Sequence, residues 1–267
     1  MGDYDTRFYK PYKPPRIYGH VPDNYDGPIY YRVAQQYGKR IGNSPVGIEG
    51  HYDGPGAHKP PNNFIASVLY DMLEGYHVRS SPVLFDEQGG LRDLWKQPLS
   101  GVVSRKAPKK WPEFAYGISL VSERVHDIIE RHEPGMHVFI PVDVSTDGNS
   151  LRQYVFINRG GSKHTMLARD GDMVGHRVFE KENGDFSLSA IPNYGAQYIA
   201  EKEEDYYFFY LRRNTVDDQK VFFITETYSD VFSPDVVDEM GDVLPPWMGF
   251  YPIGVKDELV EVGDVVI

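Results

Sequence analysis

Residues 114–160 constrain the fold more than any other part of the chain. Ser122 precedes a run, residues 125–132, whose apolar side chains recur at the spacing of one helical face. A serine at that place is a good helix N-cap, and Pro134 followed by Gly135 is a helix-stop signal. The stretch therefore predicts a short capped helix that ends in a glycine turn.

Two strand patterns follow this helix. Apolar residues alternate with other residues from Val138 to Val144, and a second alternating run places Tyr154 and Phe156 on one face. An Asp-Gly turn cluster separates the two runs. Proline cannot donate to a strand ladder, so we expect the first strand to be an edge strand or locally irregular at Pro141. These patterns predict an α+β fold, in which a few short helices pack on a mostly antiparallel twisted sheet.

The composition excludes several classes of protein. Of 267 residues, 40% are hydrophobic and 14% aromatic, which is enough to build a core and excludes a disordered chain. The chain has no cysteine, so disulfides, cysteine zinc sites and cysteine nucleophiles are excluded. We expect no signal peptide and no membrane span, because no apolar run suits either role. The expected location is the cytoplasm.

The chain divides by composition at about residue 61. Residues 1–61 are rich in Tyr, Pro and Gly, and we expect an extended arm there, with 29–37 as its one candidate element. Residues 62–267 are expected to form a single α+β domain. The main elements expected in it are helices at 62–75 and 233–241, a helical turn at 92–97, and strands at 83–86, 172–180, 186–192, 205–212, 219–225 and 250–266, with 219–225 central because it is apolar on both faces.

Negative charge is concentrated at the end of the chain. The formal net charge is −11, and residues 226–267 contain ten Asp or Glu residues and one Lys. An acidic surface repels nucleic acid and attracts basic partners. We therefore expect no nucleic-acid partner and no membrane partner. A soluble acidic surface and a docking face for a basic protein are both consistent with this charge.

The search for catalytic chemistry gives one weak candidate. The Gly- and Pro-rich loop at 49–58 gathers carboxylates and imidazoles that can bind a divalent metal, but its spacing matches no metal motif. Two histidines lie within 132–137, yet Pro134 breaks the helix that an H-E-x-x-H zinc site requires. We expect no cofactor, no resident metal and no catalytic site. The loop candidates are Glu49, His51, Asp53 and His58.

Three motifs occur in a fixed order in the central stretch. They are V-S-E-R-V at 121–125, E-P-G-x-H-x-F-x-P-V at 133–142 and Y-x-x-x-N at 154–158. In this order they resemble the bacterial immunity-protein family Imm11, also described as DUF1629. A later strand and helix, within residues 220–240, resemble the C-terminal part of that family, so the resemblance covers residues 83–241.

The resemblance implies a non-catalytic protein of bacterial competition. Such a protein neutralises a cognate toxin by stoichiometric binding that occludes the toxin's active site. The shared motifs are typical of fold determinants, so no functional residue is carried over from the family. From charge and aromatic content we expect the docking face at Asp235, Asp238, Glu239, Asp242 and Trp247.

Two alternatives come from other classes of protein. One is a structural or scaffold component that forms a homo-oligomer, with the Tyr- and Pro-rich arm making the contacts between subunits. The other is a metal-dependent enzyme that uses the 49–58 loop. The sequence leaves the oligomeric state and the identity of the toxin open.

Overall fold

Contacts between Cα atoms in the computed structural model divide the chain into two compact units. The first unit comprises residues 1–12, 42–159 and 243–245, and the second comprises 13–41, 160–242 and 246–267. Each unit combines segments that are far apart in the sequence, so the predicted division at residue 61 stays a prediction. The structure describes residues 8–21, 23, 25–36, 39, 46–48, 81–103, 111, 113–115, 120–146, 149–160, 162–163, 165–166, 176–180, 186–190, 210–212, 218–224 and 229–256.

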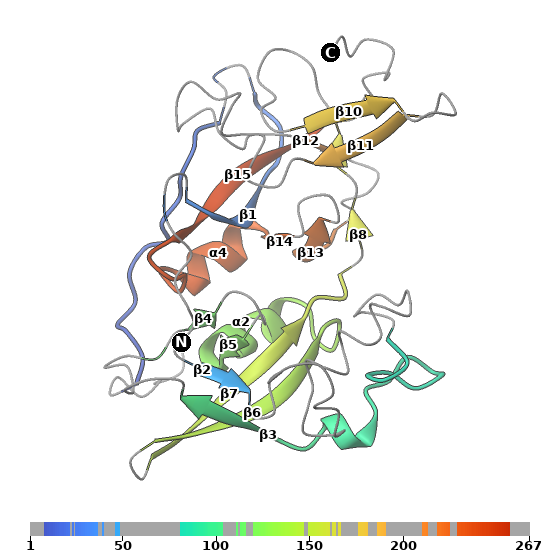
Figure 1. The fold of residues 1–267 in the computed structure, drawn as a ribbon. Coiled ribbons are helices and arrows are strands. Elements are labelled where there is room, and N and C mark those ends of the chain that lie inside the picture. Colours follow the sequence, from blue (N-terminus) through green and yellow to red (C-terminus); the bar gives the residue numbers. More distant parts are fainter. Residues whose placement is uncertain are drawn as a thin grey trace. The chain divides into compact units, whose positions relative to one another are not determined.

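The first unit is built on a six-stranded sheet (Figure 1). Its strand order is β2-β3-β6-β7-β5-β4. The β6–β7 hairpin is the longest pairing, with a register that runs from Val138 opposite Ile157 to Thr146 opposite Asn149. The strands are β2 (Val46–Ile48), β3 (Leu99–Val103), β4 (Phe114–Ala115), β5 (Leu120–Ser122), β6 (Val138–Thr146) and β7 (Asn149–Ile157).

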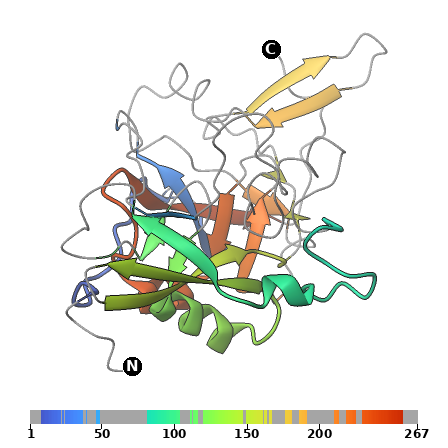
Figure 2. The same cartoon turned by 60° about the horizontal axis from the view of Figure 1, so that its bottom comes forward.

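The helix α2 (Glu123–His132) forms as its sequence predicts. The Val125 N–H donates to Ser122 Oγ at 3.2 Å, which confirms the N-cap. The helix ends at His132, and Gly135 follows with φ +66°. Figure 2 shows α2 lying along the β6–β7 hairpin. The stretch of residues 114–160 therefore has the predicted order of helix, turn and two strands.

The two faces of the β6–β7 hairpin carry different side chains. Ile140 and Val155 belong to the buried hydrophobic core of the first unit. On the opposite face, Phe139 stacks on Phe156 with ring centroids 5.3 Å apart, and Tyr154 stacks on His126 of α2 at 4.2 Å. The alternation read from the sequence thus separates an aliphatic face from an aromatic face, and the aromatic face receives α2.

One sequence prediction for the first unit is wrong, and another holds only in part. The residues expected to form a strand at 83–86 form a turn, in which the Leu84 and Phe85 N–H groups donate to Ser81 O, and Phe85 makes only an isolated bridge with Leu91. The predicted helical turn at 92–97 is present as η1 (Asp93–Trp95). The strand β6 lies between β3 and β7 and is therefore no edge strand, but β3 pairs only from Val142 onward. Pro141 is accommodated because the β3 ladder begins after it.

The second unit is built on a seven-stranded sheet with the order β8-β13-β14-β1-β15-β12-β9. The pairs β1–β15, β1–β14 and β13–β14 are antiparallel. The hairpin β10–β11 forms a separate two-stranded sheet. The strands are β1 (Ile29–Gln35), β8 (Ser162–Lys163), β9 (Thr165–Met166), β10 (His176–Glu180), β11 (Phe186–Ala190), β12 (Tyr210–Arg212), β13 (Val221–Ile224), β14 (Ser229–Phe232) and β15 (Met248–Lys256).

At the described residues, the strand predictions for this unit agree with the structure except at 219–220, which precede β13, and at 248–249, where β15 begins before the predicted run. The runs at 172–180, 186–192, 205–212, 219–225 and 250–266 contain β10, β11, β12, β13 and most of β15. The strand β13 is interior, between β8 and β14, as its apolar faces predict. The mostly antiparallel sheets and the helices α2 and α4 (Pro234–Met240) confirm the α+β class. The predicted helix at 62–75 lies outside the described residues.

The N-terminal segment pairs with β15 at Phe250, before the residues of β15 that pair with β12. The Tyr18 N–H donates to Phe250 O at 2.8 Å, and the Phe250 N–H donates to Arg16 O at 3.1 Å. Further along, the Tyr25 hydroxyl lies 2.5 Å from the Val255 nitrogen and accepts its N–H. These bonds hold the segment along β15, in the same unit.

Candidate partner-binding surface

The helix α4 carries a buried face and an acidic face. Val236, Val237 and Met240 are fully buried, and α4 lies against β1. The spacing i, i+3, i+4, i+7 places the four predicted carboxylates on the other side of the helix and just past its end. We call these four residues the α4 stripe: Asp235 and Asp238, which are exposed, and Glu239 and Asp242, which are half-buried.

The start of α4 is stabilised differently from the prediction. Ser233 is the N-cap residue and Pro234 opens the helix, as predicted, but the Ser233 side chain caps no backbone N–H. The Ser233 hydroxyl instead donates to a carboxylate oxygen of Asp235. The other oxygen of Asp235 accepts from the Lys220 ammonium. Asp235 therefore holds the first turn of α4 through its side chain and shares its charge with a cation.

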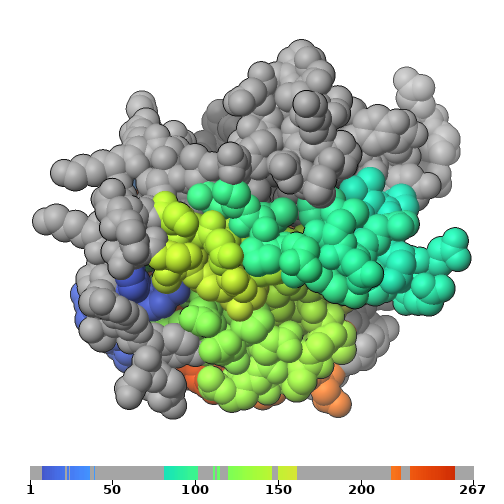
Figure 3. Space-filling model, turned by 90° about the horizontal axis from the view of Figure 1, so that it is seen from below, coloured from blue at the N-terminus to red at the C-terminus, as the bar shows by residue number. Residues whose placement is uncertain are grey.

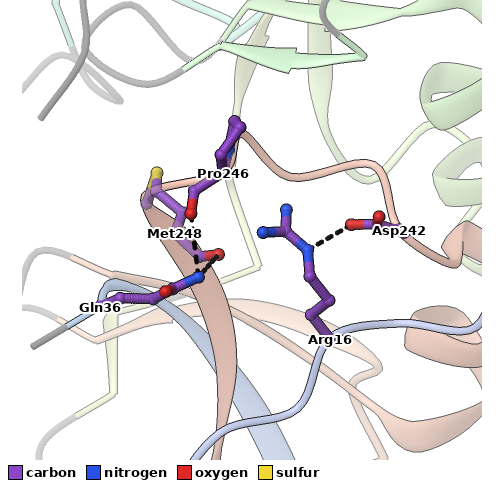
Figure 4. Close-up of polar contacts among 5 residues, drawn as sticks. All are labelled: Arg16, Gln36, Asp242, Pro246 and Met248. Atoms are coloured by element: carbon purple, nitrogen blue, oxygen red, sulfur yellow. Dashed lines mark hydrogen bonds and ion pairs between the residues drawn. The ribbon is translucent and has the colours of Figure 1, made fainter. Parts of the chain in front are cut away.

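The end of α4 is fixed by the N-terminal segment. Gly241 has φ +65°, which ends the helix. The next residue, Asp242, receives the Arg16 Nε–H at 2.5 Å through its carboxylate, and its own N–H donates to Lys13 O at 2.9 Å (Figure 4). The Arg16 and Asp242 side chains are 27% and 21% exposed. This ion pair is shielded enough to fix Asp242 in place but still borders solvent.

Asp238 is the exposed carboxylate in the middle of the stripe. Burial, followed by the negative charge of Asp238, raises the pKa of the Tyr31 hydroxyl on β1 above its usual value. The negative electrostatic field of Asp238 thus extends to β1, against which α4 lies. A negative potential at this place favours the approach of a positively charged partner.

Trp247 lies in a turn that Gln36 clamps. The Gln36 N–H donates to Trp247 O at 2.9 Å, and its buried side-chain amide donates to Pro246 O at 3.1 Å and Met248 O at 3.0 Å (Figure 4). Gln36 is 5% exposed. The Trp247 side chain is half-buried, and its indole N–H has no acceptor among the described residues. The main chain on both sides of this tryptophan is therefore rigidly held.

All five residues predicted for the docking face lie in the second unit. Sequence reasoning did not find Arg16, Lys220 or Gln36, which position three of these five residues. Arg16 and Asp242 are 226 positions apart, and no local pattern marks such a pairing. The only signal available was opposite charge.

The described residues add no candidate site for the alternative of a metal-dependent enzyme. No group of three or more His, Asp or Glu side chains that could hold a metal occurs among the described residues. The 49–58 loop, with Glu49, His51, Asp53 and His58, lies outside the part that the structure describes. Where helices are described, none is long and apolar enough to cross a membrane.

Comparison with known proteins gives one match. The immunity protein family (Imm11) matches residues 67–158, which confirms the resemblance seen in the sequence for that part of the chain. The matched residues lie entirely in the 42–159 segment of the first unit. Figure 3 shows residues 81–103, 120–146 and 149–159 of this unit lying beside one another on one face. No curated protein and no solved structure matches the chain.

Proposed function

We propose that this protein is an immunity protein that binds a bacterial toxin and neutralises it without catalysis. The observation that carries the proposal is the match of residues 67–158 to an immunity protein family. The matched motifs are structural in this chain, since Ser122 caps α2 and His137 joins α2 to β6. Stoichiometric binding that covers the toxin's active site is the mechanism that suits a chain whose shared motifs build the fold.

We place the toxin-binding surface at the α4 stripe and Trp247. These residues lie outside the matched segment, so the support for them comes from their own chemistry. The stripe offers Asp235 and Asp242, which are held by Lys220 and Arg16, and Trp247 offers an aromatic side chain on a turn whose main chain Gln36 holds. An interface of this type needs about 800 Å² per partner and is dominated by a few aromatic and charged anchors.

The charge indicates the kind of toxin. The formal net charge of −11 steers basic proteins toward this chain and disfavours nucleic acid. A toxin that acts on phosphate-bearing substrates in the cytoplasm would have the required basic surface, because it must attract phosphate itself. We propose such a basic toxin as the partner and the cytoplasm as the place of neutralisation.

The test is co-expression with the product of the adjacent open reading frame. We expect that product to stop growth when it is expressed alone, and we expect this protein to restore growth and to copurify with it at a fixed stoichiometry. Rescue without copurification would contradict neutralisation by binding. A defined homo-oligomer with no toxic neighbour would support the scaffold alternative. Bound metal together with an activity lost in His51→Ala would support an enzyme.

A further inference from the structure

The Trp247 indole N–H is a buried donor that lacks an acceptor among the described residues. Such a group is rare in folded proteins, because a donor loses its hydrogen bond to water on burial. Without a new acceptor, this loss costs free energy. Trp95 shows the usual solution in the same chain, since its indole N–H donates to Val83 O at 2.7 Å. Among the described residues, the Trp247 indole N–H therefore has no acceptor, and it belongs to a half-buried aromatic side chain.

We propose that Trp247 is the anchor of the toxin interface and that its indole N–H donates to a main-chain carbonyl oxygen of the toxin. This inference rests on the proposed function. The side chain gives up no hydrogen bond when it turns its N–H toward a partner, because it makes none with the described residues of the free protein. Binding then supplies the missing acceptor.

The clamp by Gln36 explains why the anchor is efficient. Three hydrogen bonds from Gln36 fix the carbonyl groups of Pro246, Trp247 and Met248 before any partner arrives. Binding therefore has to order only the indole side chain and not the turn that carries it. Preorganisation of this kind raises affinity by reducing the entropy lost on association.

The chemistry of the surface selects the acceptor on the partner. A carboxylate of the toxin would be repelled by Asp238 and its neighbours on the α4 stripe. A neutral carbonyl oxygen meets no such repulsion and is present at every residue of a main chain. A basic toxin can then use its cations for the stripe and one main-chain carbonyl for Trp247.

The first readout is the indole ¹⁵N–¹H spectrum of the full chain labelled at its three tryptophans. The probe is the purified product of the adjacent open reading frame, and Trp247→Phe assigns the Trp247 signal. We expect this signal to move downfield when the probe is added, as its N–H gains an acceptor. The Trp95 signal is the internal reference, because its acceptor is already in place.

The second readout uses Trp247→Phe, which keeps an aromatic ring and removes the N–H. We expect its affinity for the probe to fall about tenfold, the size of one hydrogen bond. We expect its free energy of unfolding to be unchanged or higher, because an unsatisfied buried donor is removed. If Trp247 had only a structural role, the Trp247→Phe variant would instead lose stability and keep its affinity for the probe.

The outcomes separate the two proposals. If the wild-type chain binds the probe while the Trp247 signal stays in place and Trp247→Phe binds equally well, the anchor is overturned and the immunity function stands. If the wild-type chain neither binds nor neutralises the probe, the proposed function fails and the anchor fails with it. A shifted signal together with weaker binding of Trp247→Phe supports both.

Discussion

His137 and Glu133 join the end of α2 to the start of β6, with Nε2 of the histidine 2.7 Å from a carboxylate oxygen of Glu133. The Nδ1 atom of His137 accepts the Arg159 N–H at 3.2 Å, so the ring proton lies on Nε2 and is donated to Glu133. Arg159 continues the network, since its guanidinium donates to Gly89 O at 2.8 Å and lies over the Phe85 ring. The histidine of the E-P-G-x-H motif is thus a structural connector.

Removing this imidazole should destabilise the protein strongly. The His137 side chain is fully buried and Glu133 is 9% exposed, so His137→Ala removes the imidazole to which a shielded carboxylate and the Arg159 N–H are bonded. We expect a loss of about 3 kcal/mol in the free energy of unfolding, measured by urea denaturation. Glu133→Gln is the matched control, because its amide oxygen can still accept from Nε2. Equal losses for the two variants would contradict this reading.

The local features of the fold could be predicted from the sequence because their causes are local. An N-cap serine directly before the helix, apolar residues at helical spacing and a Pro-Gly pair after it are enough to place α2. Alternation of apolar and other residues is enough to place β6 and β7. The prediction of a strand at 83–86 was wrong because the Ser81 carbonyl accepts from two successive N–H groups, so that the chain turns there. Apolar content alone does not report such a turn.

The candidate surface could be predicted only in part. The acidic face of α4 follows from helical spacing, which the sequence contains. Its ion pair with Arg16 and the clamp of Gln36 on the 246–248 turn depend on how distant strands pair, since β1 lies beside β15 in the sheet. One sequence without an alignment holds no record of that pairing, so these positioning residues could not be found.

Two glycines should differ sharply in their tolerance of alanine. A Cβ at Gly160 would lie 1.9 Å from the carbonyl oxygen of Val221, which belongs to β13 and cannot move alone. A Cβ at Gly135 would meet no atom within 4 Å, and only its φ of +66° opposes substitution. We expect Gly135→Ala to cost about 1 kcal/mol and Gly160→Ala to cost at least about 3 kcal/mol. Thermal and urea unfolding of both variants would test this order, and a reversed order would refute it.

Tyr9 should make the protein sensitive to alkali. Burial, followed by the charges of Glu123 and Glu113, raises the pKa of its hydroxyl above the ordinary value. The folded state thus prefers the neutral phenol, so stability is complete below the unfolded pKa of about 10 and falls as the pH rises toward the folded value. We expect the free energy of unfolding to decrease between about pH 9.5 and 11.5.

Tyr9→Phe isolates this effect. The variant removes the buried hydroxyl and keeps the ring, so we expect its free energy of unfolding at pH 8 to stay within about 1 kcal/mol of the wild type. Its stability should then depend less on pH above pH 9.5, because one titrating group is gone. A series of urea unfolding curves across this range provides the comparison, and an unchanged alkaline slope would show that other groups dominate.

Charge reversal on the α4 stripe should slow association with the toxin. Asp238 is exposed and lies within α4, away from its N-cap at Ser233 and its C-cap at Gly241, so we expect Asp238→Lys to reverse a charge and keep the helix. Charges at the rim of an interface act mainly on the association rate and its salt dependence. We expect the association rate with the adjacent gene product to fall about two- to tenfold at low salt, measured by stopped flow or surface plasmon resonance.

The control is Glu87→Lys, which makes the same change in net charge at an exposed site in the first unit. If the stripe steers the toxin, Glu87→Lys should slow association less than Asp238→Lys, because it changes the net charge and leaves the α4 stripe intact. The difference between the two variants should also shrink as salt is added. Equal slowing by both variants would mean that net charge, and not the α4 stripe, attracts the partner, and the surface would then have to be sought elsewhere on the chain.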